Sequence, residues 1–444
     1  MQQPDSASTT AFALGERPTR RLKLFYLLAM TSLGGTAHIA LRMAQGLAAR
    51  GHDLTLFLPD GGGDLYARAR AYGLTVDTHM AMTPKLRQPV RWVSDAVYLK
   101  RRIEESQPDI LQSFRPPDLY MALGARAMLA QSPALVSVRA IVNPVVPHPF
   151  NTAVQRALID QVICSAEVIY RRFADPATDP CPDEAGVYIR KKARRLMSWW
   201  NQRSYDLGKI GWLRDGVDPQ RTQPAWEAPA ALVTRLNARR ELGFDEDTVV
   251  VGMLGRMAAV KGHKTLAQAL QALQERNPDR PDRPARKVGV LLVGPTNTNI
   301  QHMIEGMLKD YQRAGRLKIT GYRTDPVSCL HAMDIFVHPS LGSEGNARAL
   351  LEALSCGLCP VVSTAGILPE YVRHEDNGLV FEVGDWRMLA DHLERLIQSP
   401  AMRRQFARRS RELAATEYSH EHFIDRLEWL YGRLVERHSV AGAI

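Results

Sequence analysis

Residues 22–58 read LKLFYLLAMTSLGGTAHIALRMAQGLAARGHDLTLFL, and this stretch decides the fold class. It begins with an apolar run at 24–30 and ends with a second one at 54–58. Between the two runs, apolar residues recur at three- and four-residue spacing, which predicts a helix closed by Gly51. Continuous apolar runs joined by a helix are typical of parallel strands buried on both faces. The stretch therefore predicts a β–α–β unit of a doubly wound α/β domain.

The same alternation continues along the chain in two halves. Further strands are expected in the first half at 110–113, 135–138, 162–165 and 210–213. The second half restarts the pattern, with strands expected at 249–254, 288–293, 317–320, 335–338 and 360–363. Helices are expected at 265–275, 347–355, 386–398, 401–416 and 420–437, among others. The sequence thus predicts two Rossmann-like domains with parallel sheets that face a central cleft.

Changes in composition suggest the domain boundaries. Residues 1–20 are polar and are expected to form a flexible tail. We place an N-terminal Rossmann-like domain at 21–213, with a basic insert at 174–208, and a C-terminal Rossmann-like domain at 214–417. Residues 418–444 are expected to form a helix that packs back on the N-terminal domain.

The composition excludes several classes of protein. The chain has 444 residues, of which 45% are hydrophobic and 23% are charged, values that are usual for globular proteins and unlike those of disordered, collagen-like or membrane-embedded chains. It contains no run of 18 or more mostly apolar residues, so no transmembrane helix is expected. The apolar run at 24–30 follows basic residues, as in a secretory signal. We interpret it as a buried strand because a polar lead precedes it and a helix pattern follows it.

The net charge of +10 suggests an anionic partner. The net charge alone does not choose among a phosphorylated ligand, an anionic membrane surface and nucleic acid as this partner. Nucleic acid is disfavoured, because the basic residues are spread out and the sequence contains no helix-turn-helix, RNA-recognition or zinc-binding motif.

The five cysteines are too few and too scattered for a disulfide framework, which favours a reducing compartment. Cys356 and Cys359 form a CxxC pair, but no second Cys/His pair stands at zinc spacing. We interpret the pair as a packing element, and no metal site is expected.

Gly34 and Gly35 follow the first expected strand and open the first helix. Glycines at this junction allow a phosphate or sugar to approach the backbone, where helix N–H groups favour anions. A tight turn is the alternative. Residues 34–39 do not form GxGxxG, and the chain has no Walker motif, so simple nicotinamide-dependent and P-loop chemistries are disfavoured.

Arg256 and Lys261 follow the first strand of the second half. An arginine can bind phosphate oxygens in a bidentate manner and a lysine adds a point charge, so the pair predicts a phosphate site. A solvated charged loop is the alternative.

Glu344 and Glu352 lie eight residues apart. Glu344 follows a strand in a loop, where we expect its charge to be solvated, and Glu352 lies within an apolar helix face. A carboxylate in such a face needs a partner, because burial of an unpaired charge is costly. Ribose or hexose hydroxyls suit this role, and an internal ion pair is the alternative.

Together these residues resemble the GT-B glycosyltransferases of the large retaining family that includes bacterial lipopolysaccharide and phosphatidylinositol glycosyltransferases, known as glycosyltransferase family 4 or glycosyl transferases group 1. The resemblance spans roughly residues 22–385, and the paired glutamates are its most specific part. The matching stretches are Gly34-Gly35-Thr36, 48–56, Asp215-Gly216-Val217-Asp218, Gly255-Arg256, Lys261-Gly262, 334–340, Glu344-Gly345, 350–353, Cys356-Gly357, 360–362, Gly366 and Pro369-Glu370.

This resemblance implies a metal-independent transfer from a nucleotide-diphosphate sugar with retention of configuration. Arg256 and Lys261 would neutralise the diphosphate, Glu344 would contact the transferred sugar and Glu352 would bind the ribose. The remaining donor contacts implied are Gly34, Gly35, Gly321, Tyr322 and the amides of Gly345, Asn346 and Ala347. The catalytic residues implied are Glu344, Arg256 and Lys261, with no cofactor.

The chain departs from the family pattern at two positions. Asn346 stands where the family often has a bulky apolar residue, and Arg139 stands near the place where a histidine is expected. We therefore expect Arg139 on the acceptor side, with His38 and His148 as substitutes for the missing histidine.

A basic stretch within the expected insert suggests contact with a membrane. As a helix it would carry interfacial tryptophans among cations, a pattern that suits an anionic bilayer surface. A helix packed on the domain is the alternative. The stretch contains Arg190, Lys191, Lys192, Arg194, Arg195, Trp199 and Trp200.

The expected function is transfer of a sugar to a cell-surface glycan or glycolipid. The expected location is cytoplasmic, peripheral on the inner face of the membrane. Two alternatives remain: another GT-B enzyme, such as a nucleotide-sugar epimerase, and a catalytically inactive nucleotide-binding scaffold.

Overall fold

The computed structural model describes residues 20–82, 88–140, 149–174, 205–224, 226, 229–276, 287–342 and 344–441. These residues form two compact units. The first holds the described residues up to 174, residues 205–215 and the end of the chain from Glu421, and the second holds Gly216–His420. The expected basic stretch at 190–200 and His148 lie outside the described residues.

The first unit is built on a parallel sheet in the order β3-β2-β1-β4-β5-β6-β7. Most of its strand residues are buried, as expected for a sheet with helices on both faces. The strands are β1 (Lys23–Leu27), β2 (Asp53–Phe57), β3 (Thr75–Asp77), β4 (Ile110–Ser113), β5 (Ala134–Arg139), β6 (Gln161–Cys164) and β7 (Ile210–Trp212).

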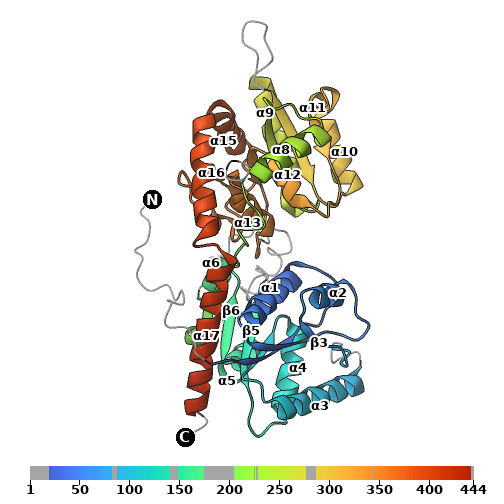
Figure 1. Ribbon diagram of the computed structural model, residues 1–444, viewed down its shortest axis with the longest axis vertical. Coiled ribbons are helices and arrows are strands. Elements are labelled where there is room, and N and C mark those ends of the chain that lie inside the picture. The colour runs from blue at the N-terminus through green and yellow to red at the C-terminus, as the bar shows by residue number, and fades with distance from the viewer. Residues whose placement is uncertain are drawn as a thin grey trace. The chain divides into compact units, whose positions relative to one another are not determined.

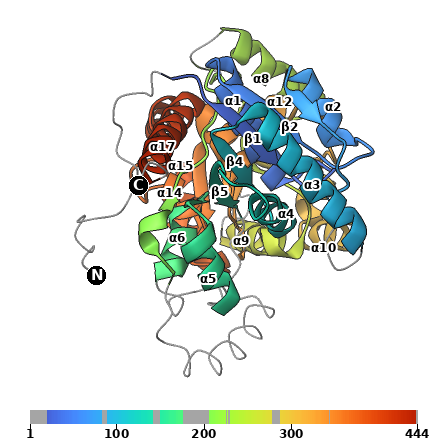
Figure 2. The ribbon, with the colours of Figure 1, turned by 90° about the horizontal axis from the view of Figure 1, so that it is seen from below.

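Helices cover this sheet, and their apolar faces complete its core. One face shares its core with α1 and α2, through residues such as Leu41 and Leu65. Helices α3 and α4 lie side by side (Figures 1 and 2). The helices are α1 (Gly35–Ala49), α2 (Asp64–Ala71), α3 (Pro89–Ser106), α4 (Pro116–Arg126), α5 (Pro149–Leu158), α6 (Glu167–Ala174) and the 3₁₀ turn η1 (Leu207–Lys209).

The second unit is built on a parallel sheet in the order β10-β9-β8-β11-β12-β13. Residues Val249, Val251 and Met253 project from it into a core shared with α9 and α15. The strands are β8 (Val249–Leu254), β9 (Val288–Val293), β10 (Leu317–Ile319), β11 (Ile335–His338), β12 (Cys359–Ser363) and β13 (Leu379–Phe381).

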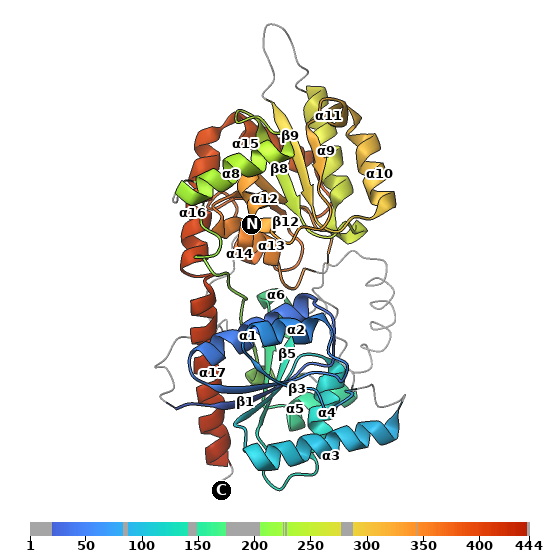
Figure 3. The same ribbon diagram turned by 45° about the vertical axis from the view of Figure 1, so that its right-hand side comes forward.

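The helices of the second unit pack as neighbours around this sheet. Helices α9 and α10 lie side by side (Figure 3), α8 packs on α12, and α13 packs on α16. They are α8 (Pro229–Leu242), η2 (Ala259–Lys261), α9 (His263–Arg276), α10 (Thr298–Met307), α11 (Lys309–Arg313), α12 (Pro326–Ala332), α13 (Arg348–Ser355), α14 (Leu368–Tyr371), α15 (Trp386–Gln398) and α16 (Pro400–Ala415).

The last helix, α17 (His420–Ala441), returns the chain to the first unit. Leu427 and Tyr431 on this helix are fully buried in the first core. Glu428 binds His52 at 2.8 Å and Arg50 at 2.7 Å, so hydrogen bonds and apolar contacts hold the helix against α1 and β2.

The boundary between the units lies at Asp215/Gly216, two residues after the position expected from composition. A Cβ at Gly216 would lie 2.3 Å from the carbonyl oxygen of Ser419. Val217 N–H donates to Tyr418 and His420 N–H donates to Val217. The segment at 216–217 and the segment at 418–420 are thus hydrogen-bonded to each other, and only a glycine at position 216 allows them to approach this closely.

The structure contains β3 and β13, which the sequence did not predict. Each has three residues, too few to show an apolar run or a period. None of the helices in the described part of the chain is both long and apolar enough to cross a membrane.

Candidate active site

The expected donor residues of the second unit gather at the carboxyl ends of its parallel strands. The loops after β8 and β9 are bonded to each other, because Gly255 N–H donates to Val293 and Met257 N–H donates to Pro295. Gly294 N–H in turn donates to Gly321, which follows β10. A Cβ at Gly294 would lie 2.2 Å from the carbonyl oxygen of Gly255, so a glycine lets these loops meet.

These contacts place Arg256 and Tyr322 on neighbouring loops. Arg256 is exposed and forms no ion pair with any described residue. The side chain of Tyr322 is also largely open to solvent, with 73% of the residue exposed. A cation and an aromatic ring are thus both available to a ligand at this edge.

Lys261 is held against the end of β11 by the glycine that follows it. Gly262 has φ +74°, and a Cβ there would lie 1.8 Å from the carbonyl oxygen of Pro339. Leu341 N–H also donates to Val260 at 2.7 Å. The loop that carries Lys261 therefore rests directly on the backbone that leads to Glu344.

Three side chains converge on Oε1 of Glu344. Lys261 Nζ and Ser340 Oγ each lie 2.5 Å from it, and His338 Nε2 lies 3.4 Å away. The expectation that this carboxylate is solvated was wrong, because Glu344 is only 3% exposed. Strand β11 and the turn after it supply His338 and Ser340, and the segment after β8 supplies Lys261.

This arrangement keeps Glu344 ionised. Burial by itself would raise the pKa of Glu344, but the charges and hydrogen bonds of His338 and Lys261 hold that pKa well below its usual range. The backbone is fixed as well, because Ile367 N–H donates to the carbonyl oxygen of Glu344 and Gly366 packs against it.

Residues 345–347 lead from this carboxylate into α13. Gly345 and Ala347 are buried, and no side chain caps the start of the helix within the described residues. Asn346 Oδ1 is buried without a hydrogen-bond partner among the described residues. N–H groups at an uncapped helix start favour an anion, and a buried amide oxygen favours a donor.

Glu352 already has a partner inside the protein. Arg348 Nε lies 2.9 Å from Glu352 Oε1, one helical turn away, and the carboxylate is half-buried. The internal ion pair that the sequence left open as an alternative is therefore present. A role of Glu352 toward ribose stays a prediction.

Gly34 and Gly35 of the first unit have no packing contact that would require a glycine. Gly34 and Gly35 lie at the start of α1, after β1. A Cβ at Gly35 would meet nothing within 4 Å, and one at Gly34 would meet only Met30, at 3.9 Å. Neither residue has a positive φ, so the tight-turn alternative does not explain them.

The expected acceptor residues stand in two different environments. His38 lies on the first turn of α1, where partial desolvation and the nearby Arg42 and Arg68 lower its pKa. The guanidinium of Arg139 lies 5.4 Å from the centre of the Phe173 ring, and burial lowers its pKa. The Arg139 guanidinium therefore packs against Phe173 of α6 and does not extend into solvent from the end of β5.

Asp118 was not predicted from the sequence and is fully buried at the start of α4. It accepts hydrogen bonds from Ala29 N–H at 2.7 Å and Phe114 N–H at 3.2 Å, and so joins the ends of β1 and β4. Burial outweighs these bonds and raises the pKa of Asp118 to about 6. A single acidic residue after two prolines gives no periodic signal that could have revealed this.

The described residues contain no group of three or more His, Cys, Asp or Glu side chains that could hold a metal ion. Cys356 and Cys359 are free and buried. Burial raises the pKa of both thiols, so neither is poised as a thiolate ligand or nucleophile.

Two family models match parts of this chain. Residues 234–413 match the family described as glycosyl transferases group 1, and residues 33–178 match glycosyltransferase family 4. The chain belongs to glycosyltransferase family 4. Together the two matches include every expected site residue described above.

Curated relatives of this family show partial similarity. A lipopolysaccharide core biosynthesis glycosyltransferase of Rhizobium meliloti is 28% identical over 42% of this chain and 51% of the relative. A GDP-mannose-dependent phosphatidylinositol monomannoside mannosyltransferase of Corynebacterium glutamicum is 28% identical over 48% of this chain and 54% of the relative. The chain thus spans about half the length of the curated relatives it matches.

Solved structures show the GT-B fold. A glycosyltransferase from Rickettsia africae superposes with a TM-score of 0.74 at 16% identity and covers 94% of this chain and 99% of its own. An Anabaena protein solved with UDP and glucose has a TM-score of 0.67 at 17% identity and covers 92% of this chain and 99% of its own. At these identities the likeness establishes two Rossmann-like units and nothing finer.

Proposed function

We propose that this family 4 protein is a retaining glycosyltransferase that moves a sugar from a nucleotide-diphosphate donor to a cell-surface glycan or glycolipid. The observation that carries the proposal is the cluster around Glu344. It brings a buried carboxylate and the Lys261 cation to the edge of the sheet where Arg256 stands open. Ligands of doubly wound folds bind at this edge.

The cations suit a diphosphate. Arg256 has no internal carboxylate to neutralise it among the described residues, and Lys261 Nζ has three N–H groups, of which Glu344 takes one. Both can therefore donate to phosphate oxygens. The main electrostatic contribution of Arg256 and Lys261 would be to stabilise the leaving diphosphate.

Glu344 would then stand beside the transferred sugar. A carboxylate that stays ionised can stabilise positive charge that develops at the anomeric carbon. In a retaining transfer without a metal, the leaving diphosphate can itself take the proton of the acceptor hydroxyl. The protein then supplies positioning and charge rather than a nucleophile.

The remaining donor roles in the second unit follow the same edge. The amides of Gly345, Asn346 and Ala347 would hold the sugar or a phosphate, and Gly321 and Tyr322 would lie near the base. Gly34 and Gly35 would admit a phosphate from the first unit, which fits the absence of packing around them. His38 and Arg139 would belong to the acceptor side.

The relatives support a nucleotide-sugar donor and a glycolipid or glycan acceptor without selecting among them. The Anabaena protein was solved with UDP, and the Corynebacterium relative is GDP-mannose-dependent. A nucleotide-sugar epimerase or an inactive scaffold would use the same donor residues. Only turnover with an acceptor separates the transferase from these two alternatives.

The deciding experiment has two stages. Thermal unfolding with UDP, GDP or ADP identifies the donor base, because a ligand at about a hundred times its Kd stabilises the native state by about 2.7 kcal/mol. The matching nucleotide sugars are then tested with acceptors, with the anomeric configuration read by NMR. Retention is expected, and activity should persist in EDTA. Inversion, or loss with EDTA and recovery with Mn²⁺, would contradict the mechanism.

We also propose a cytoplasmic location with peripheral attachment to the membrane through the basic stretch at 190–200. Each cation near an anionic bilayer contributes about 1 kcal/mol, so attachment should weaken steeply with salt. Changing Arg190, Lys191, Lys192, Arg194 and Arg195 to Gln should abolish co-sedimentation with anionic vesicles. Equal sedimentation of variant and wild type would refute this attachment.

A further inference from the structure

A cavity lies in the second unit, at the edge of the sheet opposite the edge that holds the expected donor residues. It has a volume of about 760 Å³ and is lined by residues of α8, α16 and the segments that precede β11 and β12. Asp334 and Leu358, which line it, come immediately before these strands. Because the sheet is parallel, this cavity is at its amino edge and is separate from the donor site.

Helix α16 supplies an unusual number of cations to this region. It carries five arginines, and three of them are engaged inside the protein. Arg403 donates to carbonyl oxygens at the end of α15, and Arg409 pairs with Asp376 and Glu412. Arg411 donates to the carbonyl oxygens of Pro219 and Ser355.

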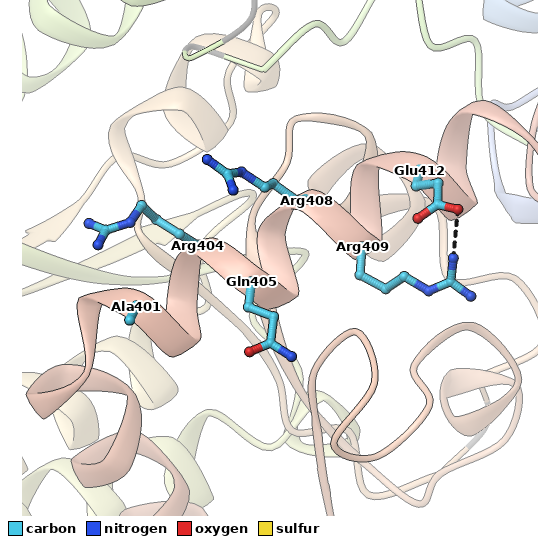
Figure 4. A pocket seen from close by; sticks show the side chains of 6 residues that line it. All are labelled: Ala401, Arg404, Gln405, Arg408, Arg409 and Glu412. Carbon is cyan, nitrogen blue, oxygen red and sulfur yellow. Dashed lines mark ion pairs between the residues drawn. The ribbon is translucent and has the colours of Figure 1, made fainter.

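Arg404 and Arg408 differ from these three. They line the cavity, and no described residue forms an ion pair or hydrogen bond with either guanidinium. Figure 4 shows both extending from the same side of α16, whereas Arg409 turns toward Glu412. They are one helical turn apart, a spacing at which like charges destabilise a helix. An anion placed between them would remove that repulsion.

The cavity contains no free counter-charge of its own. The one carboxylate among its lining residues is Asp334. It is already bound by Arg235 at 2.8 Å and Arg239 at 2.6 Å. With four arginines and one carboxylate in its lining, the cavity keeps an excess of about three positive charges. A phosphate monoester carries about −1.5 to −2 near neutral pH and would compensate most of this excess, including the charges of Arg404 and Arg408.

The cavity also offers an apolar wall. Trp226 is 50% exposed, and its ring lies against Gly357, where a Cβ would be only 2.9 Å from the ring. Leu232 of α8 is 47% exposed beside the same space. An aromatic face next to a cation pair suits a ligand with a phosphate at one end and a sugar ring or other apolar surface at the other.

We propose that this cavity binds a phosphate monoester, with Arg404 and Arg408 on the phosphate and Trp226 against the attached group. The ligand is either a free sugar phosphate or the headgroup of a monoester lipid, because both present the same phosphate chemistry. Its binding is independent of the donor proposed above, since the two sites lie at opposite edges of the sheet.

The test measures binding of glucose 6-phosphate to the full chain by calorimetry. Arg404→Gln combined with Arg408→Gln should weaken binding by about tenfold or more, because charge-assisted hydrogen bonds to phosphate are lost. Arg240→Gln combined with Arg437→Gln removes the same two charges at exposed positions outside the cavity and should leave binding unchanged. Trp226→Ala should weaken binding without changing its dependence on salt.

Two further measurements distinguish this cavity from the donor site and a free sugar phosphate from a lipid headgroup. Arg256→Ala should not affect glucose 6-phosphate binding, and vesicles that contain phosphatidic acid test the lipid source. Because the basic stretch at 190–200 is itself expected to bind anionic vesicles, binding of the vesicles alone would assign the site to a headgroup if the double Gln variant of Arg404 and Arg408 loses it. Vesicle binding that this variant retains, without binding of glucose 6-phosphate, would overturn the proposal. Failure of the wild type to bind either probe, or binding lost in Arg256→Ala and retained in the double Gln variant, would overturn the proposal. Without ligand, the double Gln variant should unfold at the same or a higher temperature than the wild type.

Discussion

Glu344 shows how a carboxylate can stay ionised in a buried place. Its carboxylate is nearly inaccessible, yet Lys261, Ser340 and His338 surround one of its oxygens. His338 and Lys261 outweigh the effect of burial and hold its pKa low. The same contacts that keep the group ionised also make it part of the folded structure.

Replacement of Glu344 by Gln should therefore affect both catalysis and stability. We expect kcat to fall, and the unfolding free energy to fall by on the order of 2 kcal/mol, because Lys261 and His338 lose their counter-charge. A carboxylate with a lowered folded pKa contributes stability above its unfolded pKa of about 4.3, and that contribution is lost as the pH falls below it. The melting-temperature difference between variant and wild type should thus be largest above pH 5 and should shrink in acid. A difference that does not change with pH would contradict the ionised pair.

Arg256 should behave differently, because it has no internal partner among the described residues. Arg256→Ala should change the unfolding free energy by no more than about 0.5 kcal/mol, yet lower kcat/KM for the donor by about one to two decades. Arg313→Ala removes another exposed arginine, on α11, and should do neither. Wild-type donor kinetics in Arg256→Ala would remove this residue from the site.

Glu352 allows the ribose role to be separated from the ion pair. If the carboxylate binds ribose, Glu352→Gln should raise KM with little change in kcat, because the contact exists in ground and transition states alike. Arg348→Gln breaks the same pair at 2.9 Å but leaves the carboxylate in place. Identical stability losses with unchanged KM in both variants would make the pair purely structural.

At the level of elements, the site depends on loops that meet at glycines. Gly262 and Gly294 each stand where a Cβ would overlap a backbone oxygen of a neighbouring loop. Both also have a positive φ. These two positions bring the end of β8 against the ends of β11 and β9, which sets where Lys261 and Arg256 stand.

Gly262→Ala should displace the loop that carries Lys261. The added Cβ would meet Pro339 O at 1.8 Å and would adopt a left-handed conformation, so we expect a loss of about 3 kcal/mol and weaker nucleotide binding. Gly315→Ala is the control, since Gly315 has a similar φ of +67° and nothing within 4 Å of the added Cβ. It should cost about 1 kcal/mol and leave nucleotide binding intact. Urea unfolding and calorimetry measure the two effects.

At the level of the whole molecule, the chain leaves the first unit and returns to it. The final helix completes the core of the unit that the first strand begins, through residues such as Leu427 and Tyr431. Tyr431 also bonds Tyr26 of β1 at 2.6 Å. Segments about 400 residues apart therefore support the same core.

Leu427→Ala should destabilise the first unit in particular. The fully buried side chain leaves a cavity when truncated, with an expected cost of about 2–5 kcal/mol. Hydrogen exchange should rise in β1, α1 and α17 and stay unchanged in β8 and β9. Leu270→Ala, an equally buried change in the second unit, should give the reverse pattern. Faster exchange in both units of either variant would mean that they unfold together.

Local sequence patterns were enough to predict the parallel α/β character of both units, because long apolar runs and helical spacing are local signals. It placed β4, β8, β9 and β11 at the residues that the structure shows. It also singled out Arg256, Lys261 and Glu344, because charged residues at strand ends stand out from their apolar neighbours.

The environment of those residues could not be predicted in the same way, because it depends on tertiary contacts. Glu344 was expected in water and is buried, Glu352 has an internal partner, and Asp118 went unnoticed. Strands β3 and β13, and the absence of a counter-charge for Arg404 and Arg408 on α16, could not be predicted for the same reason. Burial and pairing depend on which distant segments come together. A charge is solvated, paired or left uncompensated according to neighbours that the local sequence does not contain.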